Sequence, residues 1–115
     1  MATEDLGKNM QEAGRSNKAE KHIKLIIEDY EPDRIFIFGS YARGEAGPDS
    51  DLDILIIKDT ADRPVERCRK VLRLLKGSGI PKDIFVVTRR EFDAKKDLVG
   101  TVAYEAHHFG EIVYG

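Results

Sequence analysis

The sequence predicts an α/β (α+β) domain in which helices pack on a small mixed β-sheet. Three observations lead to this fold class. Short apolar runs bounded by Gly, Pro and Asp are typical of buried strands. Longer stretches with apolar residues at i, i+3, i+4 and i+7 are typical of amphipathic helices. The two patterns alternate along the 115 residues without an internal repeat, which favours one sheet covered by helices.

The first half of the chain predicts one helix and two strands. From Asn17, an apolar stripe indicates a helix that ends near Pro32, since the residue before a proline disfavours helical geometry. Residues 34–38 predict a buried strand. Residues 40–50 contain two glycines and a proline and predict a loop that opens with one helical turn. Residues 51–58 predict the second strand, whose first half alternates between aspartates on one face and apolar residues on the other.

The second half predicts two strands and three helices. Residues 63–76 show helical periodicity and are followed by a Gly-Ser-Gly terminator. Residues 83–88 predict the third strand. Two short helices are expected over 90–96 and 98–108, and the apolar stretch 112–114 is expected to add a last strand.

The helix predicted at 63–76 is expected to have one apolar and one charged side. The apolar side is expected to comprise Val65, Cys68, Val71, Leu72 and Leu75. The basic residues are interpreted as a solvated face: Arg63, Arg67, Arg69, Lys70, Arg73 and Lys76. A contact with a partner or an acidic substrate is the second interpretation of this basic face.

Composition excludes several classes of protein. Asp and Glu number 21 against 19 Lys and Arg, and a net charge of −2 argues against a nucleic-acid binder with a broad basic surface. The single cysteine excludes an internal disulfide framework and favours a reducing compartment. No apolar run approaches the roughly 18 residues of a membrane-spanning helix. We therefore expect a cytoplasmic protein with a flexible tail over residues 1–15 and one domain over residues 16–115.

One stretch carries the chemical signal. A buried strand ends in Gly39-Ser40, and ten residues later Asp51 and Asp53 stand two apart on the next strand. Gly39 lets the backbone approach a ligand closely, and Ser40 offers an N–H group and a hydroxyl to an anion. Two aspartates on one strand face are roughly 6.6 Å apart at Cα and repel each other unless cations are present. The pattern predicts a Mg²⁺-dependent phosphate site.

Asp83 is the candidate for a third carboxylate. It begins the third predicted strand, and it would lie beside the Asp51/Asp53 pair if that strand neighbours the second. The structural alternative is an ordinary turn residue at the start of a strand. Similarly, Arg43 is either a phosphate-facing residue or a surface partner of a salt bridge.

Gly39-Ser40, ten residues, then Asp51-x-Asp53 between apolar strands resembles the signature of the polymerase-β-like nucleotidyltransferases. The short chain is similar to the minimal nucleotidyltransferase subfamily, often encoded beside a partner of the HEPN class. The resemblance covers about residues 20–114, and it implies the polymerase-β-like nucleotidyltransferase fold.

The resemblance also implies a role for each matching residue. Gly39 and Ser40 match the positions that hold the nucleoside triphosphate, with Arg43 as a further nucleotide-binding position. Asp51 and Asp53 match the metal-binding aspartates, and Asp83 matches a third acid that binds metal and helps to activate the attacking hydroxyl. Two Mg²⁺ ions and ATP or another nucleoside triphosphate are the implied cofactor and substrate.

The function implied by the resemblance is transfer of a nucleoside monophosphate, AMP from ATP, to a hydroxyl of a partner protein. The expected partner is a HEPN-type ribonuclease toxin, with this chain as its antitoxin. Two alternatives stay open. One is a non-catalytic module that neutralises its partner by contact. The other is a transferase for a small hydroxylated acceptor such as an antibiotic, with the acceptor site built between subunits of a homo-oligomer.

His107 and His108 are not expected to bind metal. Adjacent residues on a helix point in different directions, and no Cys/His cluster joins them in the sequence. Positions at the core edge or in solvent are predicted instead. Cys68 is expected to be a small core residue.

Overall fold

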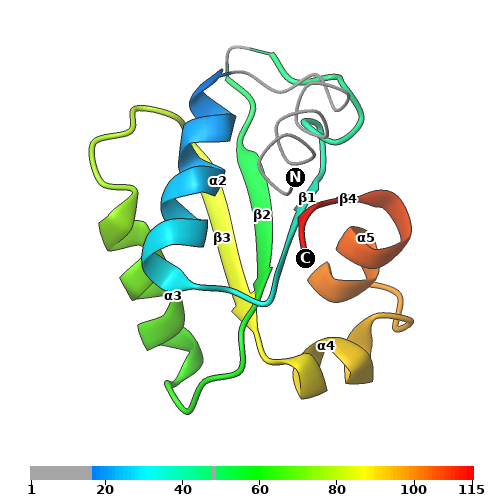
Figure 1. The fold of residues 1–115 in the computed structure, drawn as a ribbon. Helices are drawn as coiled ribbons and strands as arrows, with labels where there is room; N and C mark the ends of the chain where they lie inside the picture. Colours follow the sequence, from blue (N-terminus) through cyan, green and yellow to red (C-terminus); the bar gives the residue numbers. More distant parts are fainter. Residues whose placement is uncertain (1–16, 48) are drawn as a thin grey trace.

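The structure, a computed structural model, describes residues 17–47 and 49–115. Within them, four strands form one sheet, and four helices cover both of its faces (Figure 1). The helices are α2 (Asn17–Tyr30), α3 (Pro64–Leu74), α4 (Arg89–Lys95) and α5 (Val102–Phe109). The strands are β1 (Arg34–Phe38), β2 (Leu52–Ile57), β3 (Lys82–Val87) and β4 (Glu111–Tyr114). The predicted tail, residues 1–15, lies outside the described residues.

The sheet is mixed, which confirms the predicted fold class. Its strand order is β3-β2-β1-β4. β1 pairs antiparallel with β2 and with β4, whereas β2 and β3 are parallel. Parallel neighbours need a long crossover, and α3 supplies it between β2 and β3. This topology brings the end of β1 and the starts of β2 and β3 to the same end of the sheet.

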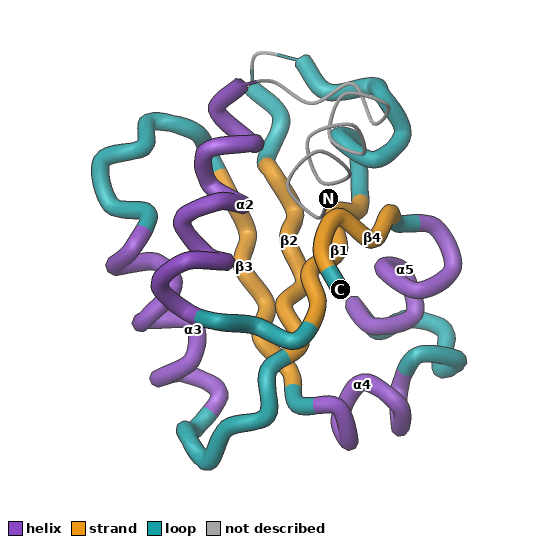
Figure 2. Tube along the Cα trace, viewed as in Figure 1, coloured by secondary structure: helices purple, strands orange, loops and turns teal. Residues whose placement is uncertain are grey.

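Two hydrophobic clusters lie on opposite faces of the sheet. Helices α2 and α3 cover one face, and α4 and α5 cover the other (Figure 2). The larger cluster joins α2 and α3 to alternate strand residues such as Ile37, Ile54 and Ile84. The smaller one joins α4 and α5 to the other parity, including Phe36 and Leu55. Because neighbouring residues in a strand point to opposite faces, strands covered on both sides are apolar throughout. That accounts for the continuous apolar runs in β1 and β2.

The first helix ends as the sequence predicts. Ile23 and Ile26 are fully buried, and Tyr30 occupies the last position of α2. Glu31 adopts a left-handed conformation with φ of 52° before Pro32. The ammonium group of Lys58, just beyond β2, donates to the carbonyl oxygens of Tyr30 at 2.6 Å and Glu31 at 3.1 Å. A cation on the last carbonyls of a helix compensates its unsatisfied acceptors.

The predicted apolar side of α3 is partly wrong. Val71 and Leu75 are buried, but Val65 and Leu72 are exposed by 63% and 45%. Arg67, assigned from the sequence to the solvated face, is instead buried with 6% exposure. The inward face of α3 is therefore rotated toward Arg67, because hydrogen bonds can hold that side chain inside.

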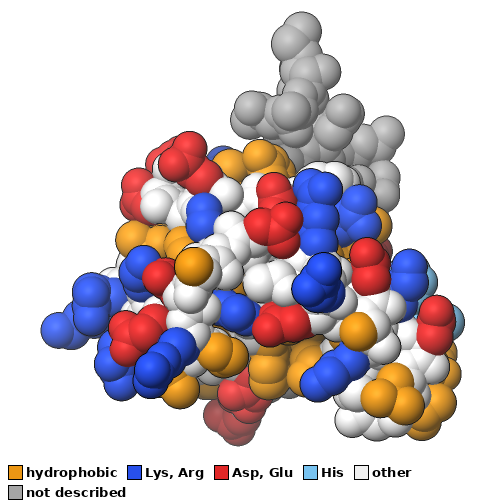
Figure 3. Space-filling view, turned by 90° about the horizontal axis from the view of Figure 1, so that it is seen from below, with side chains coloured by type: hydrophobic (Ala, Val, Ile, Leu, Met, Phe, Trp, Pro, Cys, Tyr) orange, Lys and Arg blue, Asp and Glu red, His pale blue; other side chains and the backbone are white. Residues whose placement is uncertain are grey.

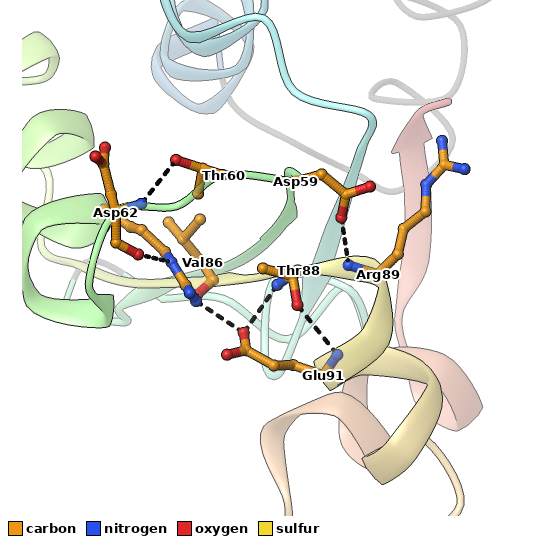
Figure 4. A network of polar contacts seen from close by, with 8 residues as sticks. Asp59, Thr60, Asp62, Val86, Thr88, Arg89 and Glu91 are labelled. Atoms are coloured by element: carbon orange, nitrogen blue, oxygen red, sulfur yellow. Dashed lines mark hydrogen bonds and ion pairs between the residues drawn. The ribbon is translucent and has the colours of Figure 1, made fainter.

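Arg67 connects three segments of the chain (Figure 4). It donates to the carbonyl oxygens of Asp62 at 2.9 Å and Val86 at 3.4 Å, and to the carboxylate of Glu91 at 2.7 Å. Glu91 also accepts from the backbone N–H of Thr88, while the Thr88 hydroxyl accepts from the backbone N–H of Glu91. This capping box starts α4, and the bonds from Thr88 and Arg67 lower the pKa of Glu91.

The last predicted helix begins later than expected. Residues 98–101 form turns, and α5 starts at Val102 with the Thr101 hydroxyl accepting from the Tyr104 N–H. Gly100 has a φ of 94°, which helical residues do not adopt. Leu98 and Val99, the first two residues of the helix predicted at 98–108, are both exposed. Among the described helices, none combines the length and apolar character that crossing a bilayer requires.

Candidate functional site

Three segments that are distant in sequence converge at one end of the sheet. Asp53 lies opposite Phe38 in the antiparallel β1–β2 register, so the turn after β1 starts beside it. Asp53 is also the register partner of Asp83 in the parallel β2–β3 pair. Asp51 directly precedes β2 rather than lying within it. The structure thus brings together the acids that the sequence singled out.

The two strand carboxylates share one face of the sheet. Asp53 has the parity of Leu55, and Asp83 has the parity of Phe85, all on the face covered further along by α4 and α5. The pKa of Asp53 is raised to about 6. The largest cause is burial, followed by the charge of Asp83, a hydrogen bond to Asp83 and the charge of Asp51. Carboxylates that compete for one proton form a site that favours added positive charge.

The backbone at Gly39 makes this close approach possible. Its φ is +72°, a conformation that side chains with a Cβ rarely adopt. A Cβ there would collide with Oδ2 of Asp53. Only glycine lets the turn after β1 pass directly over the Asp53 carboxylate.

The chain after Gly39 forms one helical turn, as predicted. The N–H of Arg43 donates to the carbonyl of Gly39 at 3.2 Å, and the N–H of Glu45 donates to that of Ser40 at 2.9 Å. No described residue accepts a hydrogen bond from the N–H groups of residues 40–42. Free N–H groups at the start of a turn form a concave donor set that suits a phosphate oxygen.

Tyr41 is a positioning residue that sequence reasoning missed. It is only 8% exposed and joins the core cluster on the α2/α3 face, so it anchors the turn between Ser40 and Arg43. The available signal was its place as the first apolar residue after Gly39-Ser40. Phe38 is a second residue near the site. It lies opposite Asp53 in the β1–β2 register, and its ring centre lies 6.0 Å from that of Phe85.

Arg43 has features of both of its proposed roles. Its guanidinium donates to the Glu45 carboxylate at 2.7 Å, and both side chains are exposed. Its charge also acts on Asp53, where it lowers the pKa against the dominant effects of burial and the neighbouring acids. Arg43 is therefore close enough to the carboxylates to influence an anion placed there, while an exposed ion pair adds little stability.

The acids at this end of the sheet have the chemistry of a divalent-metal site, but among the described residues only Asp97, His107 and His108 bring three ligand atoms within 4.8 Å of one another. Aspartate oxygens are the ligands that Mg²⁺ prefers, and Asp51, Asp53 and Asp83 supply them from adjacent segments. Burial first and the neighbouring acids second raise the pKa of Asp53, and a bound cation would offset both effects by stabilising the ionised carboxylate.

A second group of possible ligands lies away from these acids. His107 and His108 are exposed, which confirms the predicted solvent position, but Asp97 joins them. The His108 ring lies 2.9 Å from an Asp97 oxygen, and ligand atoms of all three residues lie within 4.8 Å of one another. The sequence pattern gave no signal for Asp97, because it reaches the histidines only through the turn between α4 and α5.

Comparison with known proteins relates this chain to nucleotidyltransferases. The model of the nucleotidyltransferase domain family matches residues 19–109. A crystal structure of a protein from Sulfolobus solfataricus described as a putative nucleotidyltransferase aligns with a TM-score of 0.54 and 25% identity. The alignment covers 84% of this chain and 81% of that chain.

Curated relatives from Methanocaldococcus jannaschii match shorter segments. One protein named a putative protein adenylyltransferase is 33% identical over 66 residues, which are 57% of this chain and 65% of that protein. Another of the same name is 43% identical over 44 residues, 38% of this chain and 44% of that protein. The chain thus spans about half the length of the curated relatives that it matches.

Proposed function

The chain belongs to the nucleotidyltransferase domain family, and from that premise we propose that it transfers a nucleoside monophosphate from a nucleoside triphosphate to a hydroxyl group. The observation that supports this most strongly is the register of Asp53 against Asp83, with Asp51 and the Gly39 turn beside them. This arrangement combines metal-binding oxygens with backbone donors for a phosphate, as phosphoryl-type transfer requires.

Each residue has a defined part in the proposed reaction. Asp51 and Asp53 would hold two Mg²⁺ ions, and Asp83 would be a further ligand and accept the proton of the attacking hydroxyl. The free N–H groups after Gly39 and the Ser40 hydroxyl bind the triphosphate, with Arg43 nearby. Bound Mg²⁺ supplies the positive charge that stabilises the entering and leaving oxygens. The hydroxyl oxygen forms a bond to the α-phosphorus, the bond from that phosphorus to the bridging oxygen breaks, and pyrophosphate leaves.

The acceptor in this proposal is a protein and the donor is ATP. The names of the M. jannaschii relatives, protein adenylyltransferases, support both choices. We extend the proposal to a cytoplasmic HEPN-type ribonuclease partner, which this chain would neutralise as its antitoxin by attaching AMP to a hydroxyl.

Incubation with Mg²⁺ and each α-³²P-labelled nucleoside triphosphate tests the proposal. The purified chain is assayed alone and with the product of the neighbouring gene, and the labelled protein is identified by mass spectrometry. We expect label on the partner with ATP and Mg²⁺, and none with EDTA or with Asp51→Asn/Asp53→Asn. The matched control is Asp29→Asn, which removes an exposed acid on α2.

Absence of label on any protein would overturn the assignment of a protein acceptor. If the partner were inhibited equally by the wild type and by Asp51→Asn/Asp53→Asn, the chain would act by contact alone. Label on a small hydroxylated compound in the same assay would identify a small-molecule transferase.

A further inference from the structure

The outer side of α3 has apolar side chains that the sheet does not cover. Val65 and Leu72 are seven residues apart, so they lie on the same side of the helix. They are exposed by 63% and 45%, while the opposite side of α3 packs on the sheet through Val71. This helix therefore has a second apolar stripe, which its own fold leaves in solvent.

The stripe lines a groove rather than a convex surface. The groove has a volume of about 440 Å³ and is lined by Pro64, Val65, Cys68, Arg69 and Leu72. Pro64 also borders a second hollow of about 430 Å³, which continues past the end of β3 to α5. The two hollows share Pro64, and we call the first of them, on the outer side of α3, the α3 groove.

The charges around the α3 groove are mainly positive. Arg69 and Lys70 are paired with Glu66 and Asp62. Three further basic side chains within or next to α3 have no ionic partner among the described residues: Arg63, Arg73 and Lys76. Seen from below, basic side chains gather beside exposed hydrophobic ones on the α3 side of the molecule (Figure 3). The rim thus has an excess of positive charge, although the whole chain has a net charge of −2.

We propose that the α3 groove docks an acidic amphipathic helix of the acceptor protein. Apolar side chains at i, i+3, i+4 and i+7 of such a helix would fill the groove, and its flanking Asp and Glu would meet the free cations. The proposal rests on the proposed function, since it supplies the surface that holds the protein acceptor. A second copy of this chain fits the groove less well than an acidic helix. Two copies of α3 packed face to face would bring unpaired cations together, and these would repel each other.

The position of α3 makes docking useful for transfer. β2 runs away from Asp53, and α3 returns along the sheet to the end where β3 starts beside Asp83. Its 11 residues span about 16 Å at 1.5 Å per residue. A helix bound along the groove therefore fixes the acceptor alongside the domain, with one end of the contact at the end of the sheet that carries the carboxylates, although α3 covers the opposite face of the sheet.

Peptide binding to the full chain tests the docking surface directly. The probe is a fluorescein-labelled 14-residue peptide with Leu at i, i+3, i+4 and i+7 and Glu at the flanking positions. We expect a Kd in the tens of micromolar at low salt that weakens at 300 mM NaCl. A peptide with Lys in place of Glu should bind at least ten-fold more weakly. Val65→Glu/Leu72→Glu should lose at least ten-fold in affinity for the acidic peptide.

Val99→Glu is the matched control, since Val99 is 74% exposed and lies away from the groove. It should bind the acidic peptide as the wild type does, and both variants should keep the wild-type circular dichroism spectrum. Equal binding of the acidic and basic peptides, or no effect of Val65→Glu/Leu72→Glu, overturns the proposal. Preferential binding of a 14-nucleotide RNA also overturns it, as does a wild-type dimer in sedimentation velocity that Val65→Glu/Leu72→Glu dissociates.

The two proposals fail in different ways. Asp53→Asn should abolish transfer but bind the acidic peptide with the wild-type Kd. Val65→Glu/Leu72→Glu should lose peptide binding and labelling of the partner, yet keep the wild-type affinity for ATP. A chain that binds the peptide but labels no protein would contradict the proposed function and leave the docking surface intact.

Discussion

Asp53 and Glu91 lie toward opposite ends of the same sheet, and their surroundings affect their charge in opposite directions. Burial and neighbouring acids raise the pKa of Asp53 to about 6. Hydrogen bonds from Thr88 and from buried Arg67 lower the pKa of Glu91. The fold therefore opposes ionisation at Asp53 and favours it at Glu91. Added positive charge would therefore be stabilising at the end near Asp53, whereas at the other end the charges are already compensated within the fold.

The largest effect is expected for Asp53→Asn. Transfer activity should fall roughly 1,000-fold, because the variant loses a carboxylate that we propose as a metal ligand. In the absence of Mg²⁺ at pH 7.5 the same variant should be more stable by about 1 kcal/mol, after allowance for solvent screening. That gain corresponds to a rise in Tm of about 4 °C. Labelling rates check the first effect and thermal unfolding the second. A Tm below that of the wild type would contradict the expected stabilisation by Asp53→Asn.

Gly39→Ala should lower activity about 100-fold, because its Cβ would displace the Asp53 carboxylate. The matched control is Gly44→Ala. Gly44 has the same φ of +72°, but a Cβ there would meet nothing within 4 Å. Both variants should lose about 1 kcal/mol of stability through backbone strain. If Gly44→Ala loses as much activity as Gly39→Ala, the collision with Asp53 is not the cause.

Arg67→Met tests the stabilising end of the sheet. It retains most of the buried side-chain volume but leaves the carbonyl of Val86 without its side-chain donor and the carboxylate of Glu91 with only the N–H of Thr88. We expect a loss of about 2 kcal/mol in the free energy of unfolding, measured with urea. Arg69→Met removes an exposed pair with Glu66 and should cost under about 0.5 kcal/mol. Equal losses in the two variants would mean that burial of Arg67 adds nothing.

The smallest effect is a pH dependence of stability without metal. The folded state raises the pKa of Asp53 from 3.8 to about 6, so the proton is bound more tightly in the folded chain. This stabilisation is complete below the unfolded value and is lost as pH rises through about 6. The Tm of the wild type should therefore fall relative to Asp53→Asn between about pH 5 and pH 7.5. Addition of 10 mM Mg²⁺ at pH 7.5 should reverse the fall, and a constant Tm difference would contradict it.

Local pattern predicted much of the fold and of the candidate site. The five residues of β1 were assigned with their observed bounds, because its four apolar residues, 35–38, are buried on both faces of the sheet. The contact of Asp53 with Asp83 was predictable only on condition that the strands are neighbours, and the parallel register met that condition. The roles of Gly39, Ser40, Arg43 and the acids stay predictions until the variants are measured.

Long-range hydrogen bonds account for what the sequence did not predict. Periodicity assigned Arg67 to solvent, because the pattern contains no information on its acceptors on β3 and α4. It assigned Val65 to the core for the same reason, since the side of a helix that faces inward depends on the sheet. Periodicity also extended the last helix to Leu98, where the left-handed Gly100 interrupts it.

The contacts between α3 and β3 have a consequence for association between chains. β3 is the outermost strand on its side of the sheet, and the carbonyls of Ile84 and Val86 point away from β2. Cys68 donates to the first and Arg67 to the second, so both acceptors are already used. A foreign strand that tried to extend the sheet there would have to displace α3 first. The fold thus protects this edge of the sheet from β-sheet aggregation. The surface exposed at this edge consists of the side chains of α3.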